Sequence, residues 1–536
     1  MKLREYQQRT VDQLYAWFRS NPTGHPCLVL PTGSGKSHLV AAICKDALQN
    51  WPETRVLMLT HVKELIEQNS EKMRQHWPGA PMGIYSAGIG KRELGEPITF
   101  AGIQSVRKKA SALGHVDIVI IDEAHMVSHK EGGGYRTLLA EIERINPTLR
   151  VIGLTASPYR LGHGMITDKP ALFDALIEPV TIEELVYKGY LSILRSKLTR
   201  ERLSAEGVHK RGGEYIEKDL QAVVDTNDHN AQVVAETIAL AGDRKSWLFF
   251  CAGVQHAEHI RDELREQDIS AECVTGKTPK AERARILDAY KRGEIRALTN
   301  CSVLTTGFDH PGIDLIAMLR PTMSPGLYLQ CAGRGLRVAE GKQDCLFLDF
   351  AGVVSQHGPI TAITPPRMKG CGDGEAPVRV CDNCNELVHI SVMVCPACGE
   401  PFPEPEKKPM HLHNEDVMGI ETQEMDITGW RWQPHTSRTS GKEMIRCTYY
   451  GNLSDKPVTE YFPILHDGYA GQKALRTLAN IGAGAGVELP NGGALDSLCD
   501  TLNRGCPPAL LAYRMDGKFH RVIDRQWATR RTHEKA

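Results

Sequence analysis

The chain has 536 residues, of which 41% are hydrophobic and 24% charged, and its formal net charge is −1 at pH 7. This length exceeds what one hydrophobic core organises, and the composition excludes a disordered or fibrous protein. The longest apolar runs fall far short of the ~18 residues of a membrane span, and residues 1–6 show no signal peptide. We therefore expect a cytoplasmic protein of several domains with reduced thiols and no membrane contact.

Residues 1–165 alternate strand-like apolar runs with helical patterns. The runs that predict strands buried on both faces are 27–30, 55–59, 98–101, 117–121 and 150–154. Helical patterns lie between them, for example at 37–49 and 62–76. This alternation predicts a doubly wound parallel sheet of the RecA-like type.

A second alternating block occupies residues 230–360. Its predicted strands are 247–251, 271–274, 295–300, 315–319 and 345–348, and its predicted helices are 254–267, 279–292 and 324–334. The intervening residues 166–229 are richer in Gly, Lys and Glu and have no clear period. We expect two tandem RecA-like domains, joined by a connector that carries a small inserted element.

Residues 376–404 contain two Cys-x-x-Cys pairs, and residues 411–536 alternate weakly. Four thiolates on two tight turns match tetrahedral Zn²⁺, and in a reducing compartment they predict a structural zinc ribbon. The four cysteines are Cys381, Cys384, Cys395 and Cys398. A redox dithiol and four free thiols are the alternatives, and His389 is an alternative ligand. Strand-like segments at 447–450 and 460–464 indicate an α+β C-terminal accessory domain.

A glycine-rich loop follows the first predicted strand and opens the first helix. It comprises Thr32, Gly33, Ser34, Gly35, Lys36 and Ser37. Glycines let backbone N–H groups close around phosphate oxygens, and the helix N-terminus favours negative charge. We expect Lys36 to reach the β- and γ-phosphates of ATP and the Ser37 hydroxyl to hold Mg²⁺. A chance glycine-rich turn before Lys-Ser is the alternative.

An acidic pair, Asp122 and Glu123, ends the predicted strand 117–121. The carboxyl ends of parallel strands form the edge at which ligands bind in open α/β sheets. Asp122 is expected to hold a water of Mg²⁺, and Glu123 to act as the general base on the attacking water. Taken alone, such a pair would more often be a solvated loop.

The second block ends in the pattern Gln-x-x-Gly-Arg-x-x-Arg, with Gln330, Arg334 and Arg337. We expect both arginines on one face of a helix, where they stabilise charge on the γ-phosphate and make hydrolysis depend on domain closure. Gln330 is expected to orient water or phosphate, and Gly307 and Asp309 to complete the wall of the second domain. A solvent-facing arginine pair is the alternative.

The order and spacing of these motifs resemble the signature of superfamily 2 helicases and translocases. The resemblance extends to residues 3–7, where it implies that Arg4 and Gln7 read adenine. In the segment 155–158, Thr155 and Ser157 would couple hydrolysis to strand movement, and His125 would couple the ATP site to the second domain.

The same resemblance places several motifs on the face opposite ATP. They include Thr60, His61, Gln104 and Ser105 in the first domain, and Cys251, Thr275 and Thr305 in the second. Backbone N–H groups and hydroxyls there would hold phosphates without reading bases. Each position alone also fits an ordinary turn between a strand and a helix.

The sequence as a whole resembles the bacterial RadD family of helicase-like ATPases over roughly residues 1–400. The matching segments are 29–33, 59–65, 154–162, 303–309 and 333–337, with weaker similarity at 448–450 and 513–515. The family implies a role in DNA repair and recombination and a single-stranded-DNA-binding protein as a partner. Two departures are Glu-Ala-His in the acidic box and a shorter cysteine-rich region. Similar chains occur in phage genomes, which leaves a phage origin open.

We therefore expect a monomeric ATP-dependent DNA helicase or translocase that acts in repair, recombination or replication. An RNA helicase and a nucleic-acid-binding ATPase scaffold remain alternatives, whereas the C-terminal third shows no nuclease cluster of the Asp…Glu-x-Lys type. From Arg504 onward, eight Lys or Arg residues face three acidic ones, with Tyr513, Phe519 and Trp527 interleaved. These residues fit a nucleic-acid surface, although a packed domain edge is favoured.

Overall fold

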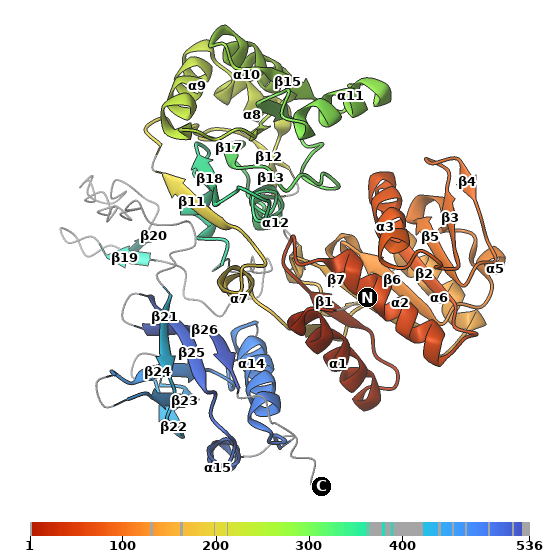
Figure 1. Cartoon of the computed structure of the whole chain (residues 1–536), viewed down its shortest axis with the longest axis vertical. Helices are drawn as coiled ribbons and strands as arrows, with labels where there is room; N and C mark the ends of the chain where they lie inside the picture. Colours follow the sequence, from red (N-terminus) through yellow and green to blue (C-terminus); the bar gives the residue numbers. More distant parts are fainter. Residues whose placement is uncertain are drawn as a thin grey trace.

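The computed structural model has two sheet-based lobes and a C-terminal unit (Figure 1). It describes residues 3–128, 132–160, 164–197, 199–211, 213–361, 363, 378–380, 387–389, 422–437, 441–452, 455–466, 469–490, 494–516 and 519–527. Within these ranges no helix combines the length and the apolar character that crossing a bilayer requires.

The first lobe is built on an eight-stranded sheet in the order β10-β1-β7-β6-β2-β5-β3-β4. Its strands are β1 (Pro26–Val29), β2 (Val56–Thr60), β3 (Met82–Ser86), β4 (Lys91–Arg92), β5 (Ile98–Gly102), β6 (Ile118–Asp122), β7 (Arg150–Thr155) and β10 (Ala175–Ile177). All neighbours are parallel except β3 and β4. A small hairpin, β8 (Tyr159–Arg160) and β9 (Gly164–Met165), follows β7.

Helices connect the strands of the first sheet as the alternating pattern predicts. They are α1 (Glu5–Ser20), α2 (Lys36–Asn50), α3 (Lys63–His76), α4 (Ile103–Val106), α5 (Ala110–Leu113), the 3-10 turn η1 (Ala124–Met126) and α6 (Gly134–Ile145). The middle strands are apolar on both faces, and β2 is buried along its whole length. This double burial is what a parallel sheet covered by helices requires.

The second lobe has a six-stranded, all-parallel sheet in the order β11-β18-β17-β14-β16-β15. Its strands are β11 (Ile193–Lys197), β14 (Trp247–Cys251), β15 (Ala271–Val274), β16 (Ala297–Asn300), β17 (Leu315–Leu319) and β18 (Asp344–Asp349). Its helices are α8 (Glu217–Val224), α9 (Asn227–Ala241), α10 (Val254–Glu266), α11 (Lys280–Lys291), α12 (Pro325–Ala332) and α13 (Val353–His357). Two tandem RecA-like domains are thus confirmed.

The segment 166–229 is more than the expected connector, because it supplies a strand to each sheet. Strand β10 extends the first sheet beside β1, and β11 extends the second beside β18. Helix α7 (Ile182–Tyr187) joins these two strands, capped by the Thr181 hydroxyl. The hairpin β12 (Lys210–Arg211) and β13 (Glu214–Tyr215) is the inserted element. Helix α7 is therefore the covalent hinge between the lobes.

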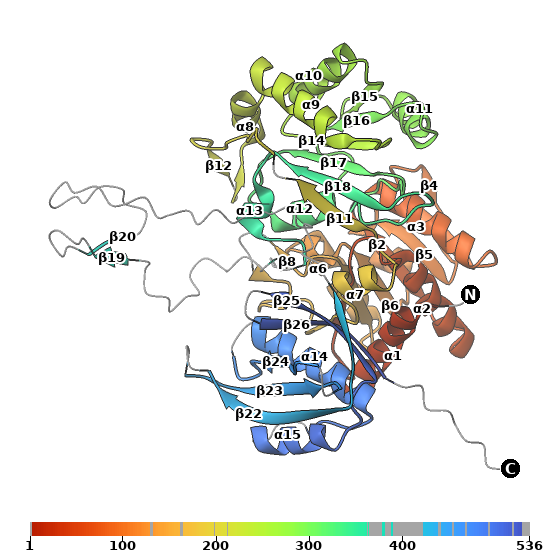
Figure 2. The same cartoon turned by 60° about the vertical axis from the view of Figure 1, so that its left-hand side comes forward.

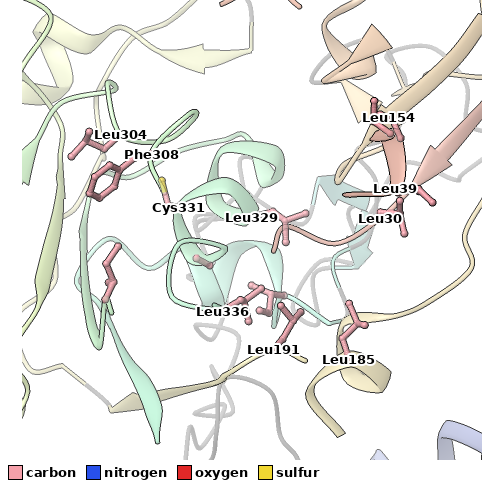
Figure 3. Packing of buried hydrophobic residues seen from close by; sticks show 14 of the residues in the cluster. Leu30, Leu39, Leu154, Leu185, Leu191, Leu304, Phe308, Leu329, Cys331 and Leu336 are labelled. Carbon is pink, nitrogen blue, oxygen red and sulfur yellow. The ribbon is translucent and has the colours of Figure 1, made fainter. Parts of the chain in front are cut away.

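One apolar cluster runs from the first lobe into the second (Figure 3). It includes Leu30 after β1, Leu185 on α7, Leu191 before β11, and Leu329 and Leu336 from the second lobe. Each of these side chains is at least nine-tenths buried. Burying a leucine stabilises a structure by roughly 1.5–3 kcal/mol, so this cluster favours contact between the lobes.

The C-terminal unit has two three-stranded antiparallel sheets and two helices. One sheet contains β21 (Gln423–Asp426), β25 (Leu510–Asp516) and β26 (Phe519–Gln526). The other contains β22 (Gly429–Thr436), β23 (Glu443–Tyr450) and β24 (Val458–Phe462). Helices α14 (Tyr469–Ala485) and α15 (Leu495–Asn503) pack on these sheets around a common core (Figure 2).

The C-terminal unit contacts the hinge helix α7 through charged side chains. Arg521 of β26 lies 2.6 Å from Glu183, and Lys188, just after α7, lies 3.7 Å from Asp524. Arg9 of α1 pairs with Glu184 at 2.7 Å. Glu183 and Glu184 are both buried. The hinge is thus held between the first lobe and the C-terminal unit.

The four predicted zinc ligands, Cys381, Cys384, Cys395 and Cys398, lie outside the described residues. Strand β19 (Val378–Val380) and strand β20 (Leu387–His389) form an antiparallel pair around the first two of them in sequence. Within the described ranges, no group of three or more His, Cys, Asp or Glu side chains is arranged to hold a metal.

Candidate active site

The phosphate loop lies between β1 and α2, where the sequence predicts it. Gly33 and Gly35 have φ angles of 85° and 79°, in the left-handed region that only glycine adopts without strain. Helix α2 begins at Lys36 directly after Gly35. The free N–H groups of its first turn therefore face the loop, which is the geometry of an anion site.

The Lys36 ammonium lies across the mouth of this loop. Its Nζ donates to the carbonyl oxygens of Leu30 at 3.1 Å and Pro31 at 3.3 Å. Burial lowers the pKa of Lys36, while the nearby carboxylates of Glu123 and Asp122 act in the opposite direction. A triphosphate bound in the loop would compensate that burial with negative charge, which is the role predicted for Lys36.

Asn69 of α3 connects the serine of the loop to the acidic pair. The Ser37 hydroxyl donates to Asn69 Oδ1 at 3.0 Å, and Asn69 Nδ2 donates to Asp122 Oδ2 at 2.9 Å. Burial, followed by the Glu123 carboxylate, raises the pKa of Asp122. A hydroxyl and a carboxylate held together are the oxygen donors that Mg²⁺ prefers, so these residues fit that cation. Sequence reasoning missed Asn69, because a lone Asn on a helix has no motif.

Glu123 is joined to the loop after β7 by a chain of polar contacts. Its backbone has a φ of 50°, an uncommon conformation for a non-glycine residue that costs of order 1–3 kcal/mol. Its carboxylate lies 3.4 Å from His125 Nδ1, which lies 2.9 Å from Thr155 Oγ1. Thr155 Oγ1 in turn donates to the Ser157 carbonyl at 3.1 Å. Of the coupling residues predicted from sequence, His125 therefore contacts the candidate base directly, and Thr155 and Ser157 are connected to it through His125.

The prediction that Arg334 and Arg337 share a helical face is wrong. Helix α12 ends at Ala332, and both arginines lie in the turn beyond it. Gly333 and Gly335 disfavour a further helical turn, because glycine is a poor helix former. The two guanidinium groups still converge, since each donates to the Phe308 carbonyl, Arg334 at 2.5 Å and Arg337 at 3.2 Å.

The arginine turn packs directly on the phosphate loop. A Cβ added to Gly333 would lie 2.7 Å from the Cβ of Thr32, and a Cβ on Gly33 would lie 3.0 Å from Leu191. Burial, followed by repulsion from Arg337, lowers the pKa of Arg334, and the Glu123 carboxylate opposes both. The cleft is therefore closed at this point, with charge from the second lobe facing the first.

Two polar contacts from α3 reach the loop that contains Gly307 and Asp309. Lys72 Nζ lies 2.7 Å from Asp309 Oδ2, and the Gln68 amide donates to the Gly307 carbonyl. Asp309 also accepts from Arg337 at 3.0 Å. Burial alone would raise the pKa of Asp309, but Arg337 and Lys72 lower it. Asp309 thus links an arginine of its own lobe to a lysine of the other.

The N-terminal segment supports the phosphate loop from outside. Gln7 Oε1 accepts from the Arg4 backbone N–H at 3.0 Å, and Gln7 Nε2 donates to the Ser34 carbonyl at 3.4 Å. The Tyr6 hydroxyl donates to the same carbonyl at 2.5 Å. The Arg4 guanidinium lies 4.4 Å from the ring centroid of Tyr190. Adenine recognition by Arg4 and Gln7 stays a prediction, and Tyr6 and Tyr190 are residues that sequence reasoning missed.

Two family models match the two lobes. The family described as "Type III restriction enzyme, res subunit" matches residues 1–160, and "Helicase conserved C-terminal domain" matches residues 229–339. These ranges contain the phosphate loop with the acidic pair and the arginine turn, respectively, in the order that a two-domain motor requires. The chain belongs to the superfamily 2 helicases. Enzymes of this superfamily are nucleic-acid-dependent ATPases.

Individual proteins agree with this assignment. The "Putative ATP-dependent helicase IRC3" of Saccharomyces cerevisiae is 27% identical over 386 residues, or 68% of this chain and 53% of that protein. The "DNA 3'-5' translocase XPB2" of Sulfurisphaera tokodaii is 24% identical over 384 residues, or 63% of this chain and 79% of that protein. The chain thus spans little more than half the length of the yeast relative.

A solved structure supports the fold of the helicase lobes. The "ATP-dependent Type ISP restriction-modification enzyme LlaBIII bound to DNA" superposes with a TM-score of 0.50 and 17% identity. The superposition covers 65% of this chain and 27% of the other. At this identity the comparison shows the arrangement of sheets and helices alone.

A cleft of about 320 Å³ opens between the lobes of the helicase, beside the arginine turn. Its lining includes His61, His125, Ser157, Thr306, Ser324 and Gln330. Burial lowers the pKa of His61, against the pull of Glu123 and Asp122. Gln330 therefore lies in the same cleft as His125 and Ser157, and its predicted role in orienting water or phosphate stays a prediction.

The remaining nucleic-acid candidates of the helicase lie at the ends of strands or in the loop or helix that follows, and four of them use their hydroxyl groups within the protein. The Thr60 hydroxyl donates to the Val62 carbonyl, the Ser105 hydroxyl accepts from the Ala87 N–H, and the Thr305 hydroxyl donates to the Ser302 carbonyl. Thr275 accepts from the Lys277 N–H. Cys251 is fully buried, so a contact there would involve its backbone. Gln104 lines a second cavity together with His61. These contacts to nucleic acid stay predictions.

Proposed function

We propose that this helicase hydrolyses ATP at the junction of its two lobes and uses the cycle to move along DNA. The observation that carries the proposal is the contact between the arginine turn and the phosphate loop at Gly333 and Thr32. This contact brings Arg334 of one lobe toward Lys36 and Glu123 of the other. Hydrolysis would then require the lobes to be closed, and release of the products would let them separate.

In the proposed reaction a water oxygen forms a bond to the γ-phosphorus while the bond to the ADP oxygen breaks. Glu123 accepts the proton of that water, and Lys36, Arg334 and Arg337 stabilise the charge on the phosphoryl oxygens. Ser37 and Asp122 would hold Mg²⁺, which when bound neutralises phosphate charge. Asn69 orients both of these side chains through its two hydrogen bonds.

The polar chain from Glu123 through His125 to Thr155 supports coupling between chemistry and movement. It leads from the candidate base to Ser157, which borders the cleft between the lobes. When the Glu123 carboxylate accepts the proton of the attacking water, its contact with His125 would change, and with it the hydrogen bond between His125 and Thr155. That shift would be transmitted to the segment facing the second lobe.

DNA is the proposed substrate, and the proposed role of the protein is in repair, recombination or replication. The archaeal relative is named a DNA translocase, which supports DNA over RNA. An RNA helicase is the second candidate, because the predicted contacts are to backbone phosphates, which both polymers share. An inactive scaffold is disfavoured by the complete set of Lys36, Glu123, Arg334 and Arg337. A single-stranded-DNA-binding protein is a proposed partner, and a cytoplasmic monomer the proposed state.

The displacement of streptavidin from biotinylated single strands tests this proposal. The native chain with ATP should release streptavidin from a DNA oligonucleotide, and the Lys36→Ala variant should not. Release of streptavidin from the RNA oligonucleotide but not from the DNA oligonucleotide would identify RNA as the polymer along which the protein moves. Hydrolysis without release from either polymer would leave an ATPase that does not translocate.

We also propose that Cys381, Cys384, Cys395 and Cys398 bind one Zn²⁺, because they form two Cys-x-x-Cys pairs. Val378–Val380 and Leu387–His389, which flank the first cysteine pair in sequence, are paired antiparallel strands, and this supports the proposal. Elemental analysis of the purified chain should show one zinc per molecule, and Cys395→Ser should abolish it. A chain purified without zinc that keeps its thermal stability would contradict this assignment.

A further inference from the structure

One face of the C-terminal sheet β22-β23-β24 carries basic and aromatic residues and is not covered by the helices of its own unit. Its outward side chains follow from the strand pairing, because paired residues point to the same side of a sheet. They are Arg431, Gln433, His435, Met444, Arg446, Thr448, Tyr450, Thr459 and Tyr461. We call this set the outer face. None of its members is buried.

The opposite face of the same sheet is the core of the unit. Trp432, Ile445, Cys447, Tyr449 and Phe462 point inward and are at most 2% exposed. They pack against residues of α14 and α15, and Figure 2 shows α15 running along β22. The helices therefore cover only the inner side, so the residues of the outer face are not needed to form the core.

The outer face is positively charged and contains no acidic residue. Its two arginines, Arg431 and Arg446, lie on the adjacent strands β22 and β23. The carboxylate of Glu460 lies on the inner side instead, where it pairs with Arg525 and accepts from Tyr449. A sheet face that exposes cations and turns its carboxylate inward is complementary to a polyanion.

Aromatic rings form a continuous row at one edge of this face. His435 lies 5.1 Å from Tyr461, and Tyr461 lies 6.3 Å from Phe519, measured between ring centroids. Phe519 begins β26 and is 64% exposed, and Tyr461 is 37% exposed. Solvent exposure of a phenylalanine ring to this extent is unfavourable, and binding of a ligand over the ring would remove that cost. The other two aromatics of the C-terminal tail are packed instead, Tyr513 against the core and Trp527 on Gly484.

From these observations we infer that the outer face, with Phe519, is a second binding site for single-stranded DNA. Arg431 and Arg446 would contact phosphates, and Tyr461, Phe519 and His435 would stack on bases. Stacking requires bases whose faces are free, which a single strand offers and a duplex does not. The choice of DNA rests on the proposed function of the motor. In Figure 1 the sheet β22-β23-β24 lies away from the junction of β1 and α2 that forms the phosphate loop.

Such a site would retain the strand while the lobes open and close. The motor is expected to loosen its own hold on the strand in each cycle, and a second contact on the same chain raises the effective concentration of DNA. Its loss should therefore weaken DNA binding and raise the DNA concentration needed for half-maximal ATPase. The ATPase rate at saturating DNA should be preserved, since no catalytic group belongs to the outer face.

The test is the affinity of the full chain for a fluorescent oligodeoxythymidylate, measured by anisotropy without nucleotide. For a Tyr461→Ala, Phe519→Ala double variant we expect a loss of about tenfold or more. Tyr461→Phe keeps the ring and should bind as the native chain does. Leu475→Ala is the matched control, because Leu475 is 51% exposed on α14 of the same unit.

The salt dependence provides an independent readout of the phosphate contacts. For Arg431→Gln with Arg446→Gln, the slope of log affinity against log salt should fall by about 1.4, or ~0.7 for each phosphate contact to a single strand. An oligouridylate measured in parallel reports whether the face prefers DNA. Tighter binding of the RNA, lost in the same variants, would overturn DNA as the ligand.

Affinities and salt slopes that match the native chain in both double variants would overturn the site itself. The proposed motor function is judged separately, by the DNA-stimulated ATPase of the native chain against Lys36→Ala. If the native chain does not hydrolyse ATP but its DNA binding is still weakened in the outer-face variants, the motor function is contradicted and this site remains.

Discussion

Asn69 holds Asp122 with a hydrogen bond of 2.9 Å while it accepts another of 3.0 Å from Ser37. One buried amide on α3 therefore sets the position of both oxygen donors proposed for Mg²⁺. The bridge uses both hydrogen-bonding groups of the amide, the oxygen toward the serine and the nitrogen toward the carboxylate. Asn69 is a positioning residue of the ATP site, and its removal gives the first prediction.

Asn69→Ala should raise the KM for Mg-ATP about tenfold. A hydrogen bond to a charged group contributes about 1.5–3 kcal/mol, and 1.4 kcal/mol corresponds to a factor of ten. Asn50→Ala is the control, because Asn50 is exposed at the end of α2 and its side-chain amide bonds to Asp46, away from the acidic pair. Steady-state kinetics over a range of Mg-ATP concentrations measures the effect. Equal KM values for the two variants would exclude the positioning role.

The affinity for Mg-ADP should increase with pH. Burial, and then the Glu123 carboxylate, raises the pKa of Asp122, so in the free protein its carboxyl holds a proton at a higher pH than usual. Mg²⁺ requires the ionised form, and binding must release that proton. Affinity should therefore tighten as pH rises through the raised pKa and then level off. Calorimetry in buffers of different ionisation enthalpy detects the released proton, and proton uptake would contradict the assignment.

Asn69→Ala should move this pH dependence further upward. The amide of Asn69 is among the groups that lower the pKa of Asp122, so its loss leaves burial less opposed. The pH at which affinity levels off should then be higher than in the native chain. An unchanged profile would mean that Asn69 does not act on the Asp122 carboxylate.

Gly333→Ala should slow ATP hydrolysis without unfolding either lobe. The added Cβ would lie 2.7 Å from Thr32 Cβ and 2.8 Å from the Leu329 carbonyl, so the arginine turn must move away from the phosphate loop. Overpacking of this kind costs about 1–3 kcal/mol, or roughly 5- to 150-fold in the population of the closed state. Gly79→Ala is the control, since a Cβ there meets nothing within 4 Å.

The readouts for this pair are kcat and the thermal unfolding midpoint. The expected pattern is a reduced kcat in Gly333→Ala with an unfolding midpoint close to that of Gly79→Ala. A normal kcat would show that the contact at Thr32 is not needed for hydrolysis.

Arg521→Ala should destabilise the attachment of the C-terminal unit to the hinge. Glu183 is 5% exposed at its side chain and pairs with Arg521 at 2.6 Å, so the substitution leaves a buried carboxylate without that partner. We expect a loss of about 1–3 kcal/mol, which denaturation should detect as an earlier first transition. Arg292→Ala removes an exposed ion pair with Glu294 and should have little effect. Equal midpoints would show that the hinge is held by other contacts.

The fold of the lobes was largely predictable, because their buried strands leave a strong signal. The predicted strand 247–251 is β14 residue for residue, and β17 coincides with 315–319 in the same way. The strands missed in the two main sheets are β3, the two-residue β4, the three-residue β10, and β11, which ends in Arg195, Ser196 and Lys197. Strands β4, β10 and β11 lie at sheet edges, where one side needs no apolar partner and short runs suffice, and β3 is next to the edge strand β4. Their signal is too weak to separate them from a connector.

The candidate site was predictable where it depends on motifs and not where it depends on packing. Lys36, Asp122 and Glu123 come together because the parallel strands β1 and β6, with β7 between them, end at one edge of the sheet. Asn69 contributes through its position on α3, which nothing in the local sequence marks. The end of α12 before Arg334 was missed because the close approach of Gly333 to Thr32 is a tertiary constraint.

The rate of ATP hydrolysis by the full chain, with and without single-stranded DNA, tests the central claim most directly. We predict hydrolysis that DNA stimulates, and that both Lys36→Ala and Arg334→Ala abolish although these residues belong to different lobes. Loss in Lys36→Ala with a normal rate in Arg334→Ala would contradict a site shared between the lobes. If the native chain hydrolyses ATP no faster than Lys36→Ala, with or without DNA, the motor function itself is contradicted.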